Sequence, residues 1–194
     1  WKEKNVLAVQ DKKEIIAIGE DAYQMYEKTP PDIEVAFPMR DGVISRFNDM
    51  QNLLQNILKK NRHFSRGAEY VIAVPTDVTE VQKKAFFDLV IHSNAKAREV
   101  NIVERSIADA VGLGIDVQNT TGVMIINFGG ETTELSVLTE GGIVFNRLLK
   151  LGGTTLDQEI VNLVRNSHDF LIGSRTAEIL RQQFDVFNGD SETA

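Results

Sequence analysis

The stretch Ile126-Asn127-Phe128-Gly129-Gly130-Glu131-Thr132-Thr133-Glu134 carries most of the information about the fold of this chain. The apolar run at 122–127 predicts a buried strand that leads into two glycines, and a second strand is expected at 132–138. Glycines permit a tight backbone in which successive N–H groups point at one phosphate, and threonine hydroxyls add further donors. The motif alone is compatible with a phosphate-binding loop and equally with an ordinary β-hairpin turn.

Upstream of this motif, the pattern predicts strands that alternate with helices. The apolar spacing of three and four residues over Phe47–Leu58 indicates an amphipathic helix, and Thr79-Glu-Val-Gln82 matches a capping box. The unbroken apolar run Tyr70–Val74 predicts a strand that is buried on both faces. The expected strands are 6–10, 14–18, 33–37, 70–74 and 100–103, and the expected helices are 20–27, 47–58, 80–93 and 107–113.

Downstream of the motif, one further strand and two helices are expected. A strand at 143–150 is followed by the segment Leu151 to Asp157, which reads either as a second binding loop or as an ordinary helix cap. Helices are expected at 155–166 and 176–184. This order predicts an α/β fold with mixed sheets, and the loop at 116–121 is the expected boundary between a first lobe, 1–118, and a second lobe, 119–194.

Composition narrows the classes of function. The 194 residues are 42% hydrophobic and 25% charged, which is typical of a globular protein with a real core. The net charge of −7 argues against nucleic acid as a partner, because phosphate backbones require a concentrated basic surface. The chain has no cysteine and three scattered histidines, so disulfides and a cysteine or histidine metal cluster are not expected.

Hydropathy and the two ends of the sequence bear on membrane insertion and on whether the sequence is part of a longer protein. No apolar run approaches the roughly 20 residues that a bilayer-spanning helix needs, and no signal peptide is recognisable. The sequence opens on Trp1 without an initiator methionine and ends in a polar tail. We therefore expect an internal piece of a longer protein, and the absence of cysteine fits a cytoplasmic one.

Five motifs occur in a fixed order along the chain. They are Val74-Pro75-Thr76, Ile102 to Ala110, Asn127 to Glu134, Gly152-Gly153-x-x-x-Asp157, and Ile172 to Glu178. Together they resemble the actin and heat-shock chaperone ATPase superfamily, and within it the MreB family of bacterial actins. The resemblance covers nearly the whole chain, so it is more specific than any one of the motifs.

The resemblance implies an actin-like ATPase (ribonuclease H-like) fold of two lobes, with a small subdomain at about 20–45 and ATP with Mg²⁺ in the cleft between the lobes. The family's first phosphate hairpin and its later adenosine loop have no counterpart within these 194 residues. This argues against ATP binding by the chain alone, and an intact protein of about 330–350 residues is expected. The cofactor-binding positions that the resemblance implies are Asn127, Gly129, Gly130, Thr132, Thr133, Gly152, Gly153, Asp157, Glu178 and Arg181.

Three positions depart from the family pattern. The family's carboxylate that organises water around Mg²⁺ is Asn127 here, and an uncharged amide holds a hydrated divalent cation less strongly. The third glycine is Glu131, whose carboxylate repels polyphosphate by about 1 kcal/mol at 4 Å in bulk water. The glutamate that positions the attacking water is replaced by Arg105, which cannot accept a proton but can pair with phosphate. Glu104 is the neighbouring carboxylate that could substitute as the catalytic residue.

These departures predict weak or absent ATPase activity; drift within a working site is the alternative. The resemblance implies a cytoskeletal filament protein of cell shape, whose subunits associate head to tail. The alternatives are a non-cycling regulatory or scaffold paralogue and an active ATPase of the wider superfamily, such as a sugar kinase or chaperone. The family also implies a place at the inner membrane face beside cell-wall synthesis proteins. The basic loop Lys59–Arg66, with Phe64 near its tip, is either a membrane contact or an ordinary solvated loop.

Overall fold

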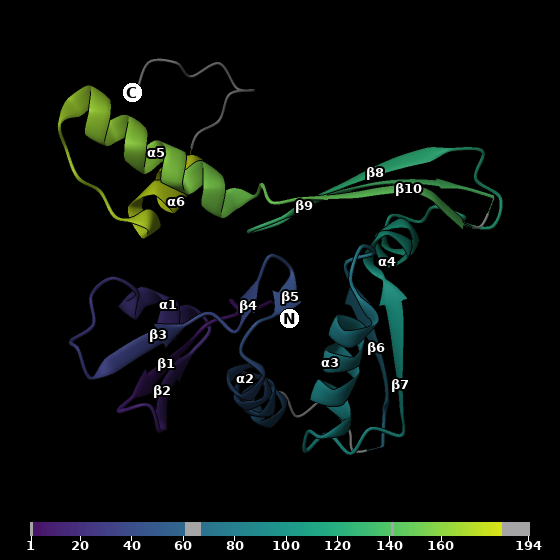
Figure 1. The fold of residues 1–194 in the computed structure, drawn as a ribbon, viewed down its shortest axis with the longest axis horizontal. Coiled ribbons are helices and arrows are strands. Elements are labelled where there is room, and N and C mark those ends of the chain that lie inside the picture. Colours follow the sequence, from purple (N-terminus) through teal and green to yellow (C-terminus); the bar gives the residue numbers. More distant parts are fainter. Residues whose placement is uncertain (1, 61–66, 141, 184–194) are drawn as a thin grey trace.

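The structure is a computed structural model, and it describes residues 2–60, 67–140 and 142–183 (Figure 1). Most of the expected basic loop, 61–66, lies outside the described residues, as do the tail from 184 and the last residue of the helix expected at 176–184. Within these described ranges, sixteen elements follow one another in an order that mixes strands and helices, as the sequence predicts. None of the helices in the described ranges is long and apolar enough to cross a membrane.

The N-terminal sheet is sandwiched between two helices. Strands β1 (Leu7–Gln10), β2 (Glu14–Ile18) and β3 (Ile33–Ala36) pair antiparallel in the order β2-β1-β3. Successive side chains of a strand point to opposite faces, so Leu7 packs with Leu53 of α2 (Phe47–Lys60), while Ala8 packs with Ala22 of α1 (Glu20–Met25). This sheet therefore buries both of its faces.

A short hairpin that the sequence analysis missed projects from this region toward the middle of the molecule. Its strands are β4 (Met39–Arg40) and β5 (Val43–Ile44), and its turn is Asp41-Gly42, with φ of 52° and 81°. Asp-Gly is a favoured pair for a tight hairpin turn that needs positive φ at both residues. Two-residue strands are too short to show alternation, which is why the pattern did not reveal them.

The next unit is a parallel pair of strands with their crossover helix. Strands β6 (Glu69–Val74) and β7 (Glu99–Glu104) are connected by α3 (Glu80–Ile91), and α4 (Arg105–Gly112) follows directly. The expectation that the 70–74 strand is buried on both faces is wrong, because Val71 is 69% exposed while Val74 is fully buried. The strand is apolar on both faces, but among the described residues helices cover one of them.

A three-stranded antiparallel sheet follows, in the order β10-β9-β8. It consists of β8 (Val123–Phe128), β9 (Thr133–Thr139) and β10 (Gly142–Leu149). The expected burial of β8 holds for Ile125 but not for its neighbours Met124 and Ile126, which are 57% and 60% exposed. Ile125 and Leu138 form a core with Ala110 of α4, so side chains on both sides of the expected lobe boundary at residue 118 pack together. The division into lobes itself stays a prediction.

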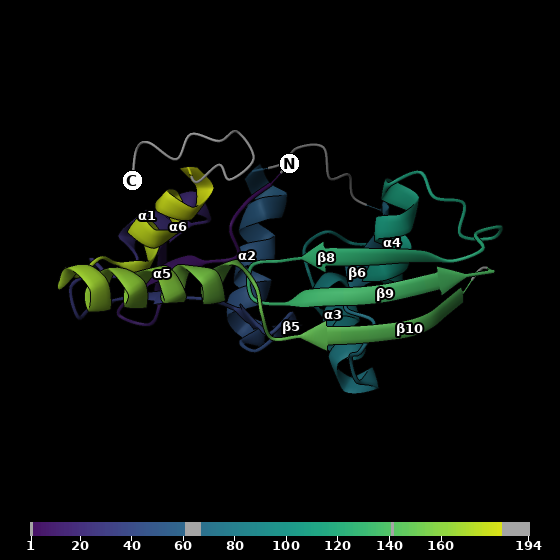
Figure 2. The same ribbon diagram turned by 90° about the horizontal axis from the view of Figure 1, so that it is seen from above.

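Two helices close the described chain, α5 (Gly153–His168) and α6 (Ser174–Gln183). They pack against each other at the end of the β8–β10 sheet and lie beside α1, as both views show (Figures 1 and 2). Hydrogen bonds confirm this proximity: Ser174 donates to Glu27 with 2.9 Å between Oγ and Oε1, and Lys4 Nζ lies 2.8 Å from Glu178 Oε1. Residues at opposite ends of the sequence therefore meet on one side of the molecule.

Candidate functional site

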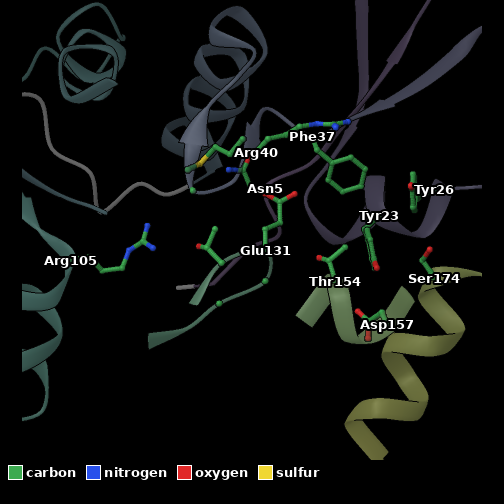
Figure 3. A pocket seen from close by; sticks show the side chains of 15 residues that line it. Asn5, Tyr23, Tyr26, Phe37, Arg40, Arg105, Glu131, Thr154, Asp157 and Ser174 are labelled. Atoms are coloured by element: carbon green, nitrogen blue, oxygen red, sulfur yellow. The ribbon is translucent and has the colours of Figure 1, made fainter. Parts of the chain in front are cut away.

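A cavity of about 520 Å³ lies where the N-terminal and C-terminal parts of the chain face each other (Figure 3). Its walls come from α1, the β4–β5 hairpin, the start of α4, the turn between β8 and β9, and the start of α5. The lining residues are Asn5, Tyr23, Tyr26, Phe37, Met39, Arg40, Gly42, Arg105, Gly129, Gly130, Glu131, Thr132, Thr154, Asp157 and Ser174. A smaller cavity of about 210 Å³ adjoins it and shares Tyr23, Gly130 and Thr154 among its lining residues.

The two glycine pairs that the sequence singled out interlock at the floor of the cavity. The N–H of Gly153 donates to the carbonyl of Gly129 at 3.0 Å, and the N–H of Thr154 donates to the carbonyl of Gly130 at 2.7 Å. A Cβ on Gly152 would lie 2.6 Å from the oxygen of Gly130, a distance that no real side chain tolerates. The turn after β8 and the start of α5 thus form a single structure that excludes side chains at position 152.

The two threonines of the motif have different surroundings. Thr132 lines the cavity, whereas Thr133 donates its hydroxyl to the carbonyl of Leu151 at 2.6 Å. Both are buried, at 5% exposure. Thr133 therefore ties β9 to the segment before α5, and Thr132 is the threonine beside the open space.

Asn127 does not line this cavity. Its side-chain Nδ2 donates to Oδ2 of Asp109 at 2.6 Å, and both residues line another cavity, of about 420 Å³. Sequence reasoning missed Asp109, although a single carboxylate among the small and apolar residues 106–111 is a usable signal. The amide at position 127 is thus committed to a carboxylate supplied by α4.

Glu131 extends from the turn into the cavity and reaches the opposite wall (Figure 3). Its Oε2 accepts a hydrogen bond from the main-chain N–H of Asp41 at 2.7 Å. The side chain of Asp41 in turn accepts from Lys150, with 2.6 Å between Oδ2 and Nζ. The departure from glycine at position 131 therefore creates a contact between the C-terminal part and the β4–β5 hairpin.

The neighbours Glu104 and Arg105 point into different spaces. Arg105 lines the 520 Å³ cavity, whereas Glu104 lines a separate cavity of about 560 Å³ with residues of α4 and the loop that follows it. The structure therefore brings Arg105, but not Glu104, together with the glycine turn. Arg40 also lines the main cavity, and the sequence analysis gave it no role.

A buried carboxylate stands behind Arg105. Glu134 is 2% exposed, and its Oε1 accepts from the N–H of Thr76 at 2.9 Å and from Nδ2 of Asn146 at 2.8 Å. Its Oε2 has no hydrogen-bond partner among the described residues and lies 4.0 Å from Nη1 of Arg105. The sequence contains Glu134 in the decisive motif, but its partners come from the segment after β6, from β10 and from the start of α4.

The three remaining predicted residues meet at the smaller cavity. Arg181 of α6 donates two hydrogen bonds to Asp157 of α5, of 2.6 and 3.3 Å. Glu178 pairs with Lys4, whose ammonium also lies 3.8 Å from the centre of the Tyr23 ring. Burial raises the pKa of Glu178, but hydrogen bonds from Lys4 and Tyr23 outweigh burial and hold this pKa below its ordinary value. Burial and the carboxylate of Glu178 both raise the pKa of Tyr23.

The residues at the expected Mg²⁺ position do not fit that ion. A hard divalent cation requires several oxygen ligands, carboxylates above all. Asn127 presents its NH₂ group to Asp109, and Glu131 is turned toward the N–H of Asp41. Within the part of the chain that the structure describes, no group of three or more histidine or acidic side chains could hold a metal ion.

Comparison with known proteins adds a sequence match that covers nearly the whole chain. The family model described as MreB/Mbl protein matches residues 1–193. The cell shape-determining protein MreB of Escherichia coli K12 is 34% identical over 197 residues, which cover 97% of this chain and 56% of that protein. The cell shape-determining protein Mbl of Bacillus subtilis is 32% identical over 183 residues, covering 92% of this chain and 54% of Mbl. The chain thus spans about half the length of these curated relatives.

Solved structures show the same fold. MreB5 of Spiroplasma citri, in crystal structures described as bound to ADP and to AMPPNP, is 32% identical and superposes with a TM-score of 0.86. The ADP structure matches 94% of this chain and 55% of the MreB5 chain. A structure described as the MamK double helical filament is 19% identical and has a TM-score of 0.75, over 94% of this chain and 58% of MamK, which supports the actin-like fold.

Proposed function

Because this chain belongs to the MreB/Mbl protein family, we propose that it is the cleft-forming part of a cytoplasmic, cell shape-determining cytoskeletal filament protein, and that it binds a nucleotide with weak or no hydrolysis. The relatives named as cell shape-determining proteins support the first half of this proposal. The relative whose structures are described as bound to ADP and AMPPNP supports nucleotide binding.

One observation carries the nucleotide proposal: the interlocked glycine turns line a cavity of suitable size. Ligand pockets commonly measure about 300–1,000 Å³, and this one measures about 520 Å³. Gly129, Gly130 and Thr132 would face the phosphates. The adjoining cavity, which shares Gly130 and is lined by Glu178 and Arg181, would hold the nucleoside end.

Weak hydrolysis follows from the side chains that line the cavity. Activation of water requires a group that accepts a proton, and a guanidinium does not accept one at neutral pH. Arg105 occupies the cavity position for which the family resemblance implies a glutamate, and Glu104 lines another space. The same observation disfavours an active ATPase, such as a sugar kinase or chaperone.

Phosphate release from ATP tests the proposal. The protein at its native length, with ATP and Mg²⁺, is expected to release phosphate no faster than the variant Glu104→Gln. A turnover that Glu104→Gln abolishes would contradict weak hydrolysis and would place the catalytic carboxylate at position 104. Sedimentation in the same buffers, with and without ATP, reports self-association into filaments.

A non-cycling scaffold paralogue is the second candidate, and the contact between Glu131 and Asp41 favours it. A protein carboxylate here joins the two sides of the cavity through a hydrogen bond that requires no ligand. Pelleting that is equal with and without ATP, or no pelleting, would support the scaffold over a nucleotide-driven filament. Contacts with a membrane surface or with cell-wall synthesis proteins remain part of the proposal by family resemblance.

A further inference from the structure

We propose that the 520 Å³ cavity binds the phosphate groups of its ligand without a divalent cation, because the guanidinium groups of Arg105 and Arg40 supply the positive charge. This inference rests on the proposed function, since it concerns the same nucleotide-sized cavity. It adds a ligand class, a phosphate ester or polyphosphate free of metal, and it assigns two recognition residues that the family pattern does not imply.

Charged side chains of both signs line the cavity. Two guanidinium groups and two carboxylates line it, those of Arg40, Arg105, Glu131 and Asp157. Asp157 is neutralised by Arg181 at 2.6 Å, and Glu131 is satisfied by a main-chain N–H rather than by a cation. With Asp157 neutralised, the lining carries the two guanidinium charges of Arg40 and Arg105 against the one carboxylate charge of Glu131, and the buried Glu134 lies behind Arg105.

Glu134 holds Arg105 by charge attraction but does not use the hydrogen-bond donors of its guanidinium group. Two donors, from Thr76 and Asn146, fix the carboxylate of Glu134 through Oε1, so that Oε2 stays beside the guanidinium at 4.0 Å. At that distance there is Coulomb attraction but no hydrogen bond. The five N–H donors of Arg105 remain available, and a guanidinium can offer two of them in parallel to phosphate oxygens.

Arg40 approaches the same cavity from another element. It belongs to β4, whereas Arg105 is the first residue of α4 (Figure 3). Arg40 forms no ion pair with any of the described residues, in contrast to Arg46 just before α2, which pairs with Glu34 and Asp49. A cation that lines a cavity without an acidic partner is suited to an anionic ligand.

The group that would organise a metal is directed elsewhere. Asn127 faces Asp109 in a different cavity, 2.6 Å from its carboxylate. Asp109 is thus the carboxylate beside Asn127, the expected metal position. Its contribution can be tested separately, because it does not line the cavity of Arg105.

The experiment is a binding titration of ATP, pyrophosphate and adenosine by calorimetry, on the protein at its native length, in EDTA and in Mg²⁺. EDTA is expected to leave the Kd for ATP within about twofold of its value in Mg²⁺. In EDTA, Arg105→Ala is expected to raise the Kd for ATP and for pyrophosphate about 10- to 100-fold, the range of a lost charge-assisted contact. The Kd for adenosine is expected to stay unchanged. Arg105→Lys should lose less, because it keeps the charge but not the planar fork.

Arg165→Ala is the matched control, since Arg165 is an exposed arginine of α5 that does not line the cavity. Its binding should equal that of the wild type, and thermal unfolding of each variant checks the fold. ATP binding that requires Mg²⁺, or that Asp109→Asn abolishes while Arg105→Ala does not, would overturn the inference and leave the proposed function standing. Failure to bind ATP in either buffer would instead overturn the proposed function, and this inference with it.

Discussion

At the scale of single residues, the contact between Arg181 and Asp157 holds α5 and α6 together. Asp157 is buried, with 11% of its side chain exposed, and Arg181 donates two hydrogen bonds to it, of 2.6 and 3.3 Å. Arg181→Ala leaves this carboxylate unpaired, so we expect the free energy of unfolding to fall by about 2 kcal/mol. Urea titration followed by circular dichroism measures this loss. Arg165→Ala on the exposed face of α5 is the comparison, and an equal loss in both variants would refute the role of the pair.

Glu178 gives the site a predictable dependence on pH. Burial raises its pKa, but Lys4, Tyr23 and Arg181 together bring it below the ordinary value. A carboxylate whose pKa is lower in the folded state stabilises fully above the unfolded pKa of about 4.3, and the stabilisation is lost as the pH falls through the folded pKa. Glu178→Gln should therefore lower the Tm at pH 7, by the equivalent of about 1 kcal/mol, and the difference from wild type should shrink as the pH falls below the ordinary glutamate pKa. A difference that is constant from pH 7 to pH 3 would contradict the assignment.

The sequence predicts site residues well where neighbours in the chain determine them. Gly129, Gly130 and Gly152 were predicted from local glycine pairs, and the structure brings them together. The sequence pattern predicts no role for Arg40 or Glu134, because the residues that surround them come from distant segments of the chain. For Glu134 the donors are Thr76 and Asn146, which are 58 and 12 residues away, so no local pattern could reveal them.

At the scale of elements, the capping box of α3 is a prediction that the structure confirms. The side chain of Thr79 accepts from the N–H of Gln82 at 3.3 Å, and the Gln82 side chain accepts from the N–H of Thr79 at 2.9 Å. Thr79→Ala should lower the free energy of unfolding by about 1 kcal/mol, because it exposes helix N–H groups that lose their acceptor. Thr79→Ser keeps the hydroxyl and should stay within a few tenths of a kcal/mol of wild type by the same urea titration. Equal effects of the two substitutions would argue against the cap.

The succession of elements was predicted more accurately than their burial. The strand at 14–18 and the start of the helix at Phe47 coincide with the expectation, because turns and amphipathic spacing are local signals. For β6 and β8, an apolar run suggested two buried faces, yet Val71 and Ile126 are exposed by 69% and 60%. An apolar run indicates that both faces of a strand could be buried, but whether another element covers each face depends on how distant segments pack.

At the scale of the whole molecule, several contacts join the N-terminal part to the C-terminal part around the cavity. Glu131 to Asp41, Lys150 to Asp41, and Glu27 to Ser174 link opposite walls. They place the β4–β5 hairpin against the turn that follows β8. The relative position of the two parts therefore depends on a few polar side chains as well as on the core shared by α4 and the β8–β10 sheet.

Hydrogen exchange at the amide of Asp41 tests the central contact. Glu131→Gly removes the acceptor 2.7 Å away, so exchange of this amide should accelerate about tenfold, the factor for a hydrogen bond worth roughly 1.4 kcal/mol. Glu131→Gln retains an acceptor oxygen and should change the rate less. Lys150→Ala breaks the neighbouring ion pair and serves as the control. An unchanged Asp41 amide in Glu131→Gly would show that the bridge does not form in solution.

The two bonds of Asp41 differ in how substitution at that position affects them. The bond to Lys150 uses the carboxylate, so any change of charge at position 41 removes it. The bond to Glu131 uses the main-chain N–H, which every residue except proline possesses. With φ at 52°, asparagine and glycine are the replacements that the turn accommodates most readily. Substitutions at position 41 can therefore remove the ion pair with Lys150 while the hydrogen bond across the cavity is kept. The side chain on which that hydrogen bond depends is the one at position 131.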